Sequence, residues 1–195
     1  MHRNTLVIVH GESERILVNA IKSRLRIPVD LYPVKRGSGT VDLPNIAEVL
    51  SSGPFKSETT LHKAYDALDY EPRSVVKMPD LHIFPILDVD RHRDLFPSYR
   101  TKDMFRGSVF SDRIVPIYND RDLDEIMEAA GFTINRADKV NSYLEAVNGM
   151  DVRDMYYRLK AIDGTNLELF LLWMLSKAPP YCNQFRAEAE IRFLG

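Results

Sequence analysis

The arrangement that most constrains the fold is an apolar, strand-like run followed directly by a helix-like one. Residues 5–11, TLVIVHG, are rich in β-branched side chains and end in glycine, which is typical of a buried parallel strand. Residues 12–26 then carry glutamates at the start, arginine at the end and apolar side chains at helical spacing, namely Ile16, Leu17, Ala20, Ile21 and Leu25. This succession predicts a strand and then a helix at the start of an α/β domain.

The rest of the first 131 residues continues the alternation of strands and helices. Further strands are predicted over residues 31–35, 81–89 and 113–119, and further helices over 44–52, 57–70 and 120–131. Two of these strands contain a proline, Pro85 or Pro116, which is unfavourable in a central strand. We therefore expect an α/β fold with a mostly parallel sheet flanked by helices over residues 1–131.

The remaining residues, 132–195, are expected to form a helical extension packed on that domain. Helices are predicted over 137–149, 151–162 and 165–180, the last ending at Pro179 and Pro180. Its apolar run, LFLLWML at 169–175, predicts a buried helix that belongs to the core or to a homodimer interface.

Composition narrows the function classes only slightly. A net charge of −2 over 195 residues gives no global attraction to nucleic acid, so such binding would need local basic patches. The single cysteine, Cys182, excludes an internal disulfide and is expected to be a passive apolar residue. The N-terminus lacks the apolar length of a secretory signal, and residues 169–175 are too few to span a membrane. We expect a cytoplasmic protein with no membrane partner.

Carboxylates follow two of the predicted strands. Glu12 and Glu14 come just after the first, and Asp88 and Asp90 end the strand at 81–89. Ligands of open parallel sheets collect outside the carboxyl ends of the strands, so if the two strands are neighbours, three or four carboxylates meet in one crevice. Crowded carboxylates raise one another's pKa, and Mg²⁺ or Mn²⁺, which favours oxygen ligands, relieves the repulsion. Glu12, Asp88 and Asp90 are therefore the predicted metal ligands.

Basic residues lie next to this predicted metal site. The segment after Asp90 contains Phe96, Tyr99 and Phe105 among its cations, which are Arg91, Arg93, Arg100, Lys102 and Arg106. Lys35 and Arg36 stand in the glycine-containing turn VKRGSGT. Cations beside a metal favour phosphate binding, glycines let backbone amides approach phosphate, and aromatic rings between cations favour base stacking. The alternative is an ordinary solvated charged face, since Asp94 and Asp103 dilute the charge.

Two motifs in this order resemble the Toprim domain of bacterial primases, topoisomerases, recombination proteins, OLD-family nucleases and small ribosomal-RNA maturases. VIVHGESERIL corresponds to the family's apolar strand, Glu-Gly turn and helix, and PILDVDRHRD to its Asp-x-Asp strand end. The resemblance covers residues 4–131 and is nearest to the OLD-like members. It implies a Toprim fold and metal-dependent cleavage or transfer at phosphodiester bonds.

One position departs from the family pattern. The glutamate that precedes the glycine in the family, where it serves as acid/base or metal ligand, is His10 here. Histidine exchanges protons near neutral pH and can take over that transfer. Alternatively Glu12 transfers the proton or reaches the metal, or the chemistry is lost and binding remains. Structural roles also stay open: His10 as a hydrogen-bonded strand-end residue, and Glu12 and Glu14 as partners of the helix dipole.

Three functions compete on this evidence. The leading one is an Mg²⁺-dependent nuclease-like enzyme acting on DNA or RNA, in DNA repair, RNA processing or phage defence. OLD enzymes usually carry an ATPase, and this chain has no GxxxxGK[ST] motif, so any ATPase is expected on a separate subunit. The second function is a catalytically inactive Toprim-like module that binds nucleic acid or a partner subunit. The third is a haloacid-dehalogenase-type phosphatase, which also has Asp-x-Asp, but in a strand that usually comes first and with different residues after it.

Overall fold

The computed structural model describes residues 5–32, 41–65, 81–179 and 181–193, and their fold is α/β as predicted. The strands are β1 (Thr5–Val9), β2 (Asp30–Tyr32), β3 (His82–Asp88) and β4 (Ile117–Asn119). The α-helices are α1 (Glu12–Leu25), α2 (Ile46–Val49), α3 (Glu58–Ala64), α4 (Phe96–Arg100), α5 (Leu123–Ala129), α6 (Lys139–Asn148), α7 (Val152–Lys160), α8 (Leu167–Lys177) and α9 (Cys182–Phe193). Short 3-10 helices are η1 (Gly53–Lys56), η2 (Asp103–Phe105) and η3 (Ser111–Arg113).

The strands form one parallel sheet in the order β2-β1-β3-β4. All five residues of β1 are buried, as its β-branched sequence predicts. In the register, Thr5 lies opposite His82 and Val9 opposite Ile86, while Leu6 lies opposite Asp30. The predicted strand at 31–35 is β2, whose described part ends at Tyr32.

The two prolines that seemed unsuited to central strands lie opposite each other. Ile83 bridges Ile114 in parallel, so Pro85 falls opposite Pro116, two residues further along. The Ile86 carbonyl accepts from His10 N–H on the β1 side of β3, and the Ile83 carbonyl accepts from Val115 N–H on the other side. Backbone groups alternate in direction along a strand, so those of Pro85 point the same way as those of Ile83, away from β1. Neither proline can donate, and the Pro85 carbonyl accepts the buried Tyr99 hydroxyl at 2.7 Å instead. This is why the strand predicted over 113–119 is regular only from Ile117.

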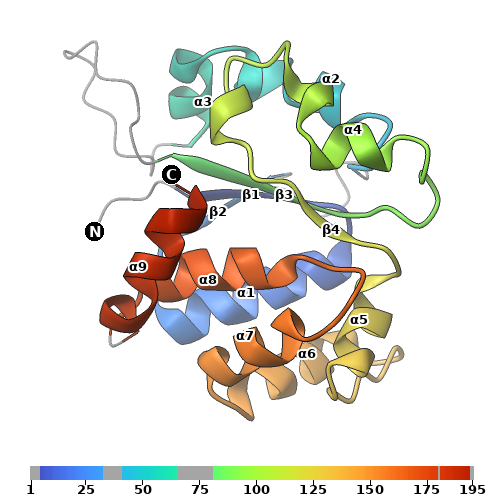
Figure 1. Cartoon of the computed structure of the whole chain (residues 1–195), viewed down its shortest axis with the longest axis vertical. Helices are drawn as coiled ribbons and strands as arrows, with labels where there is room; N and C mark the ends of the chain where they lie inside the picture. The colour runs from blue at the N-terminus through green and yellow to red at the C-terminus, as the bar shows by residue number, and fades with distance from the viewer. Residues whose placement is uncertain (1–4, 33–40, 66–80, 180, 194–195) are drawn as a thin grey trace. The chain divides into compact units, whose positions relative to one another are not determined.

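The chain divides into two compact units. The first comprises residues 1–10 and 28–116, and the second residues 11–27 and 117–195. Within the first unit, α2, α3 and α4 lie on one side of β1 and β3 (Figure 1). The residues of each unit lie close together in space. The units differ from the predicted domains, 1–131 and 132–195, and that domain boundary remains a prediction.

The second unit is a set of packed helices. Helix α1 packs against α6, and α8 packs against both α7 and α9. Eight of the 11 residues of α8 are buried, with Trp173 only 4% exposed, so the prediction of a buried helix over 169–175 is confirmed. Helix α9 was not predicted as a separate element, because only Phe185 and Ala189 of its residues are buried and they do not make an apolar stripe.

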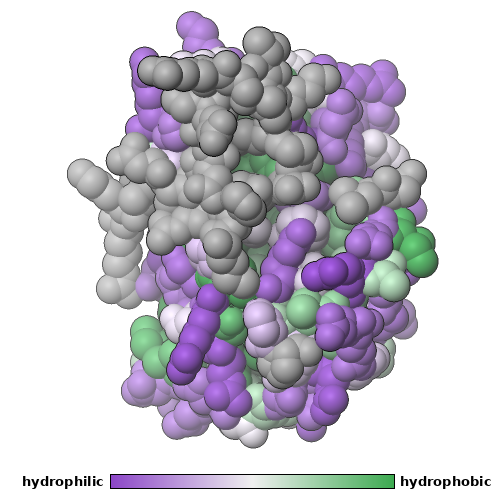
Figure 2. All heavy atoms as spheres, turned by 90° about the vertical axis from the view of Figure 1, so that its left-hand side faces the viewer, coloured by the Kyte–Doolittle hydropathy of each residue, from purple (hydrophilic) through white to green (hydrophobic). Residues whose placement is uncertain are grey.

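The surface combines polar and apolar side chains. On the face drawn in Figure 2, hydrophilic residues predominate among the coloured ones and hydrophobic residues are scattered between them. In the described part of the chain, no helix combines the length and the apolar character needed to cross a bilayer.

Candidate functional site

The carboxyl ends of β1 and β3 meet at the same edge of the sheet. The two strands are parallel neighbours in the register Val9 to Ile86, and His10 N–H donates to the Ile86 carbonyl at 3.2 Å. The two motif strands are thus neighbours, which the sequence had left open. We call this part of the first unit, with His10, Asp88 and Asp90, the β1–β3 edge.

The strand order gives this edge a further property. From β1 the chain proceeds to β2 on one side, while β3 lies on the other side of β1. The order therefore reverses between β1 and β3, and in open parallel sheets such a switch point is where ligands bind.

The His10 side chain is held by one hydrogen bond. Its Nδ1 lies 2.8 Å from the Val41 carbonyl oxygen, and the side chain is half-buried. A carbonyl only accepts, so Nδ1 carries the hydrogen and Nε2 has the lone pair when the ring is neutral. A histidine fixed in this tautomer can accept a proton through Nε2.

The two aspartates differ in their surroundings. Asp88 is the last residue of β3 and is half-buried, whereas Asp90 is exposed. Within the described ranges, no hydrogen bond or ion pair involves the Asp90 side chain. Asp90 therefore needs to break no contact with those residues in order to bind a cation.

The acidic residues do not form a larger cluster among the described residues. No group of three or more His, Cys, Asp or Glu side chains is placed there to hold a metal ion. Glu12 and Glu14 belong to the second unit and Asp88 and Asp90 to the first, so the meeting of these carboxylates in one crevice stays a prediction. The assignment of Glu12, Asp88 and Asp90 as metal ligands stays a prediction.

The two glutamates of α1 are engaged at the start of their own helix. Glu12 is 40% exposed, and its Oε2 lies 3.9 Å from Nε of Arg15. Glu14 is 3% exposed, and its Oε2 accepts the Gly11 N–H at 2.9 Å. Glu14 thus satisfies a backbone donor at the helix N-terminus, which is the structural role left open from the sequence.

The basic segment after β3 is partly available for binding. Arg91, Arg93 and Arg100 are exposed and form no ion pair with another described residue. Lys102 is half-buried, and burial lowers its pKa while Asp112 opposes the shift. Arg106 instead bonds Asp103 at 2.6 Å. The predicted phosphate-binding residues Lys35 and Arg36 lie outside the described residues.

The expectation that aromatic rings in this segment stack on bases is wrong for two of the three. Tyr99 is fully buried and Phe105 is 1% exposed, and their rings pack edge to face at 5.7 Å. Both side chains belong to the core of the first unit, where the Tyr99 hydroxyl also donates to the Pro85 carbonyl.

A polar cluster in the second unit was not foreseen from the sequence. Asp124 is 3% exposed and accepts from Lys139 at 2.6 Å, from Tyr143 at 2.8 Å and from Ser13 at 3.2 Å. We call these four residues the Asp124 network. A serine next to a lysine could be a nucleophile with its base. Here Lys139 is an ion-pair partner of Asp124 and donates to Ser13, so the geometry indicates a stabilising role. Ser13 is 111 residues from Asp124, and no local pattern links them.

Comparisons with known proteins give no indication of the function. No protein-family model, curated protein or solved structure matched the chain. The Toprim resemblance therefore rests on the two motifs alone, and the fold class rests on the strands and helices described above.

Proposed function

We propose that the β1–β3 edge binds a phosphodiester of DNA or RNA together with Mg²⁺ or Mn²⁺, and that the protein is a Toprim-like, metal-dependent nuclease. The observation that carries the proposal is the parallel pairing of β1 with β3 at the point where the strand order reverses. It places the ends of both Toprim-like motifs side by side.

The carboxylates at this edge suit the proposed cation. Mg²⁺ takes oxygen ligands and typically uses one or two protein carboxylates together with water and substrate phosphate. Asp88 and Asp90 supply such a pair, and Asp90 has no competing partner among the described residues. The bound cation supplies Lewis acidity toward the phosphate oxygens.

The remaining roles fall to residues of this chain. His10 accepts through Nε2 the proton of the water that attacks phosphorus, and the leaving oxygen takes a proton from solvent as the P–O bond breaks. Arg91 and Arg93 bind neighbouring phosphates, because both are exposed and unpaired among the described residues. The proposal includes an ATPase like that of OLD enzymes only as a separate subunit.

A second candidate is a module that binds nucleic acid without cleaving it. Two observations favour it: the usual glutamate is replaced by His10, and the described residues contain no three-ligand metal cluster. Such a module binds phosphate chains with an affinity that falls steeply as salt is raised.

Cleavage of plasmid, single-stranded DNA and RNA with Mg²⁺ or Mn²⁺ distinguishes the two. We expect Asp88→Asn and Asp90→Asn to abolish cleavage, while Asp94→Asn, a nearby exposed carboxylate, has little effect. His10→Gln keeps a donor for the Val41 carbonyl but cannot transfer a proton, so the rate should fall about 10²- to 10⁴-fold.

The other outcomes are equally clear. No cleavage by the wild type, together with salt-dependent binding, would support the binding module. The absence of both cleavage and binding would contradict both candidates. Rapid hydrolysis of a generic phosphomonoester would instead favour a phosphatase.

A further inference from the structure

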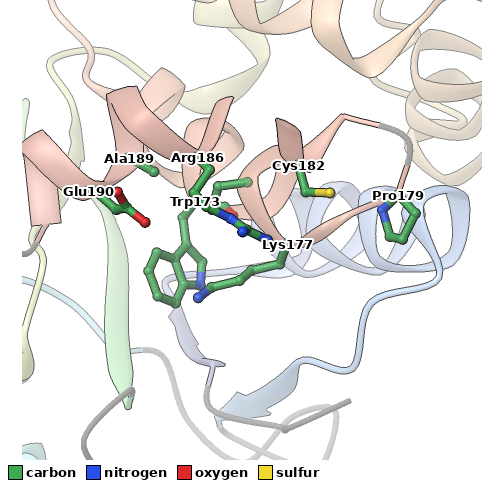
Figure 3. A pocket seen from close by; sticks show the side chains of 8 residues that line it. Trp173, Lys177, Pro179, Cys182, Arg186, Ala189 and Glu190 are labelled. Carbon is green, nitrogen blue, oxygen red and sulfur yellow. The ribbon is translucent and has the colours of Figure 1, made fainter. Parts of the chain in front are cut away.

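The second unit contains a pocket that the proposed function does not use. It lies between α8 and α9 and has a volume of about 450 Å³ (Figure 3). Its lining is Trp173, Ser176, Lys177, Pro179, Cys182, Arg186, Ala189 and Glu190. A volume of this size suits a small organic molecule.

Two cations of this pocket extend toward the same aromatic ring. Figure 3 shows the Lys177 and Arg186 side chains directed toward Trp173, and Lys177 Nζ lies 4.2 Å from the centre of that ring. Within the part of the chain that the structure describes, neither cation forms an ion pair. Like charges repel, so an anion placed between them would be stabilised by both.

The rest of the lining is mainly apolar. Trp173 and Ala189 are each 4% exposed, and Pro179 and Cys182 add further carbon and sulfur surface. Glu190 is the one acidic residue of the lining, so two positive charges face one negative charge. A ligand that matches this distribution has an oxyanion at one end and an apolar body.

We propose that the pocket between α8 and α9 binds a small organic anion, with its carboxylate or phosphate on Lys177 and Arg186 and its apolar part against Trp173 and Pro179. Glu190 disfavours negative charge at the other end of the ligand. The site is independent of the β1–β3 edge, since all its residues belong to the second unit.

The sequence supplies two reporters for this pocket. Trp173 is the single tryptophan and Cys182 the single cysteine of the chain, and both line it. Phenyl phosphate titrated into the full-length protein should change the tryptophan fluorescence and slow alkylation of Cys182, with the same midpoint. Phenylacetate tests a carboxylate head, inorganic phosphate tests charge alone, and benzyl alcohol tests the apolar part alone.

Charge variants give opposite shifts when measured by calorimetry. Arg186→Gln and Lys177→Gln should each weaken phenyl phosphate about fivefold, and Glu190→Gln should tighten it by a similar factor. Arg153→Gln, which removes a charge from α7, is the control and should change nothing. The circular dichroism spectrum and the Tm confirm that each variant is folded.

Three results would overturn the proposal. One is the absence of heat, fluorescence change and Cys182 protection with phenyl phosphate and phenylacetate at up to about 10 mM. Another is binding that Arg186→Gln and Lys177→Gln leave unchanged. The third is equal affinity for inorganic phosphate, because the apolar lining would then contribute nothing.

Discussion

Replacing Asp124 by asparagine tests how far the Asp124 network stabilises the second unit. The carboxylate is 3% exposed and accepts three hydrogen bonds, of which the ion pair with Lys139 is the shortest at 2.6 Å. Asparagine keeps an oxygen for the Tyr143 hydroxyl, but it is neutral and can turn an amide donor toward the ammonium group. The substitution therefore removes mainly the interaction with Lys139.

The magnitude follows from the burial of the two partners. Breaking a fully buried ion pair costs about 3–5 kcal/mol, but the Lys139 side chain is 36% exposed and can be hydrated, so we expect about 2 kcal/mol for Asp124→Asn. Asp124→Ala also leaves the fully buried Tyr143 without its acceptor, which adds about 1–3 kcal/mol.

The effect should also depend on pH. Burial by itself raises the pKa of Asp124, but hydrogen bonds from Lys139, Tyr143 and Ser13 outweigh it and hold this pKa below its ordinary value of 3.8. A carboxyl whose pKa is lowered by folding contributes stability above its unfolded pKa, and the contribution is lost as the pH falls through the folded pKa. The difference between wild type and Asp124→Asn should therefore shrink below about pH 4.

Urea unfolding at neutral pH, followed by circular dichroism, measures these energies. In a double-mutant cycle, Asp124→Asn with Lys139→Met should show a coupling of about 1–2 kcal/mol. The control cycle, Asp154→Asn with Arg153→Met, breaks an exposed ion pair at 3.5 Å and should stay below about 0.5 kcal/mol. Equal coupling in the two cycles would refute the role assigned to the buried pair.

Two further substitutions test backbone features in the same urea assay. Gly164 has φ +86°, and a Cβ there would overlap the Asp120 carboxylate, so Gly164→Ala should lower the free energy of unfolding by about 1–3 kcal/mol. Gly107→Ala is the control and should be nearly neutral, because the space around Gly107 is open. Similar values for the two variants would contradict the prediction. Tyr99→Phe should cost about 1–2 kcal/mol, because it leaves the buried Pro85 carbonyl without the Tyr99 hydroxyl. The control Tyr157→Phe, at a residue 49% exposed, should cost less than about 0.5 kcal/mol. No loss of stability in Tyr99→Phe would show that another group satisfies the carbonyl.

Local patterns in the sequence predicted much of the fold. The runs that became β1, α1, β3 and α8 each carry a clear period or a continuous apolar stretch, and each was placed within a few residues. The pairing of Pro85 with Pro116 was not predictable in this way, because it depends on the register between segments about 30 residues apart. The same sequence that looked defective is compatible with the sheet once the register is known.

The candidate site was predicted in part. The sequence left open whether the two motif strands are neighbours. The structure shows that they are, so their carboxyl ends share an edge. The bond from His10 to Val41 spans 31 residues, and the bond from Ser13 to Asp124 spans 111, so neither has a local sequence signal. Tyr99 and Phe105 looked like stacking residues from composition, but their burial is set by tertiary packing.

The partnership of α1 with α6 has a consequence for synthesis of the chain. The buried face of α1 includes Leu17, Val18 and Ile21, and its partner α6 begins about 110 residues later. At about 5–20 residues per second, the ribosome produces α6 roughly 6–20 s after α1. During that interval α1 lacks its partner α6, so we expect its apolar face to be accessible to chaperones that bind short apolar segments.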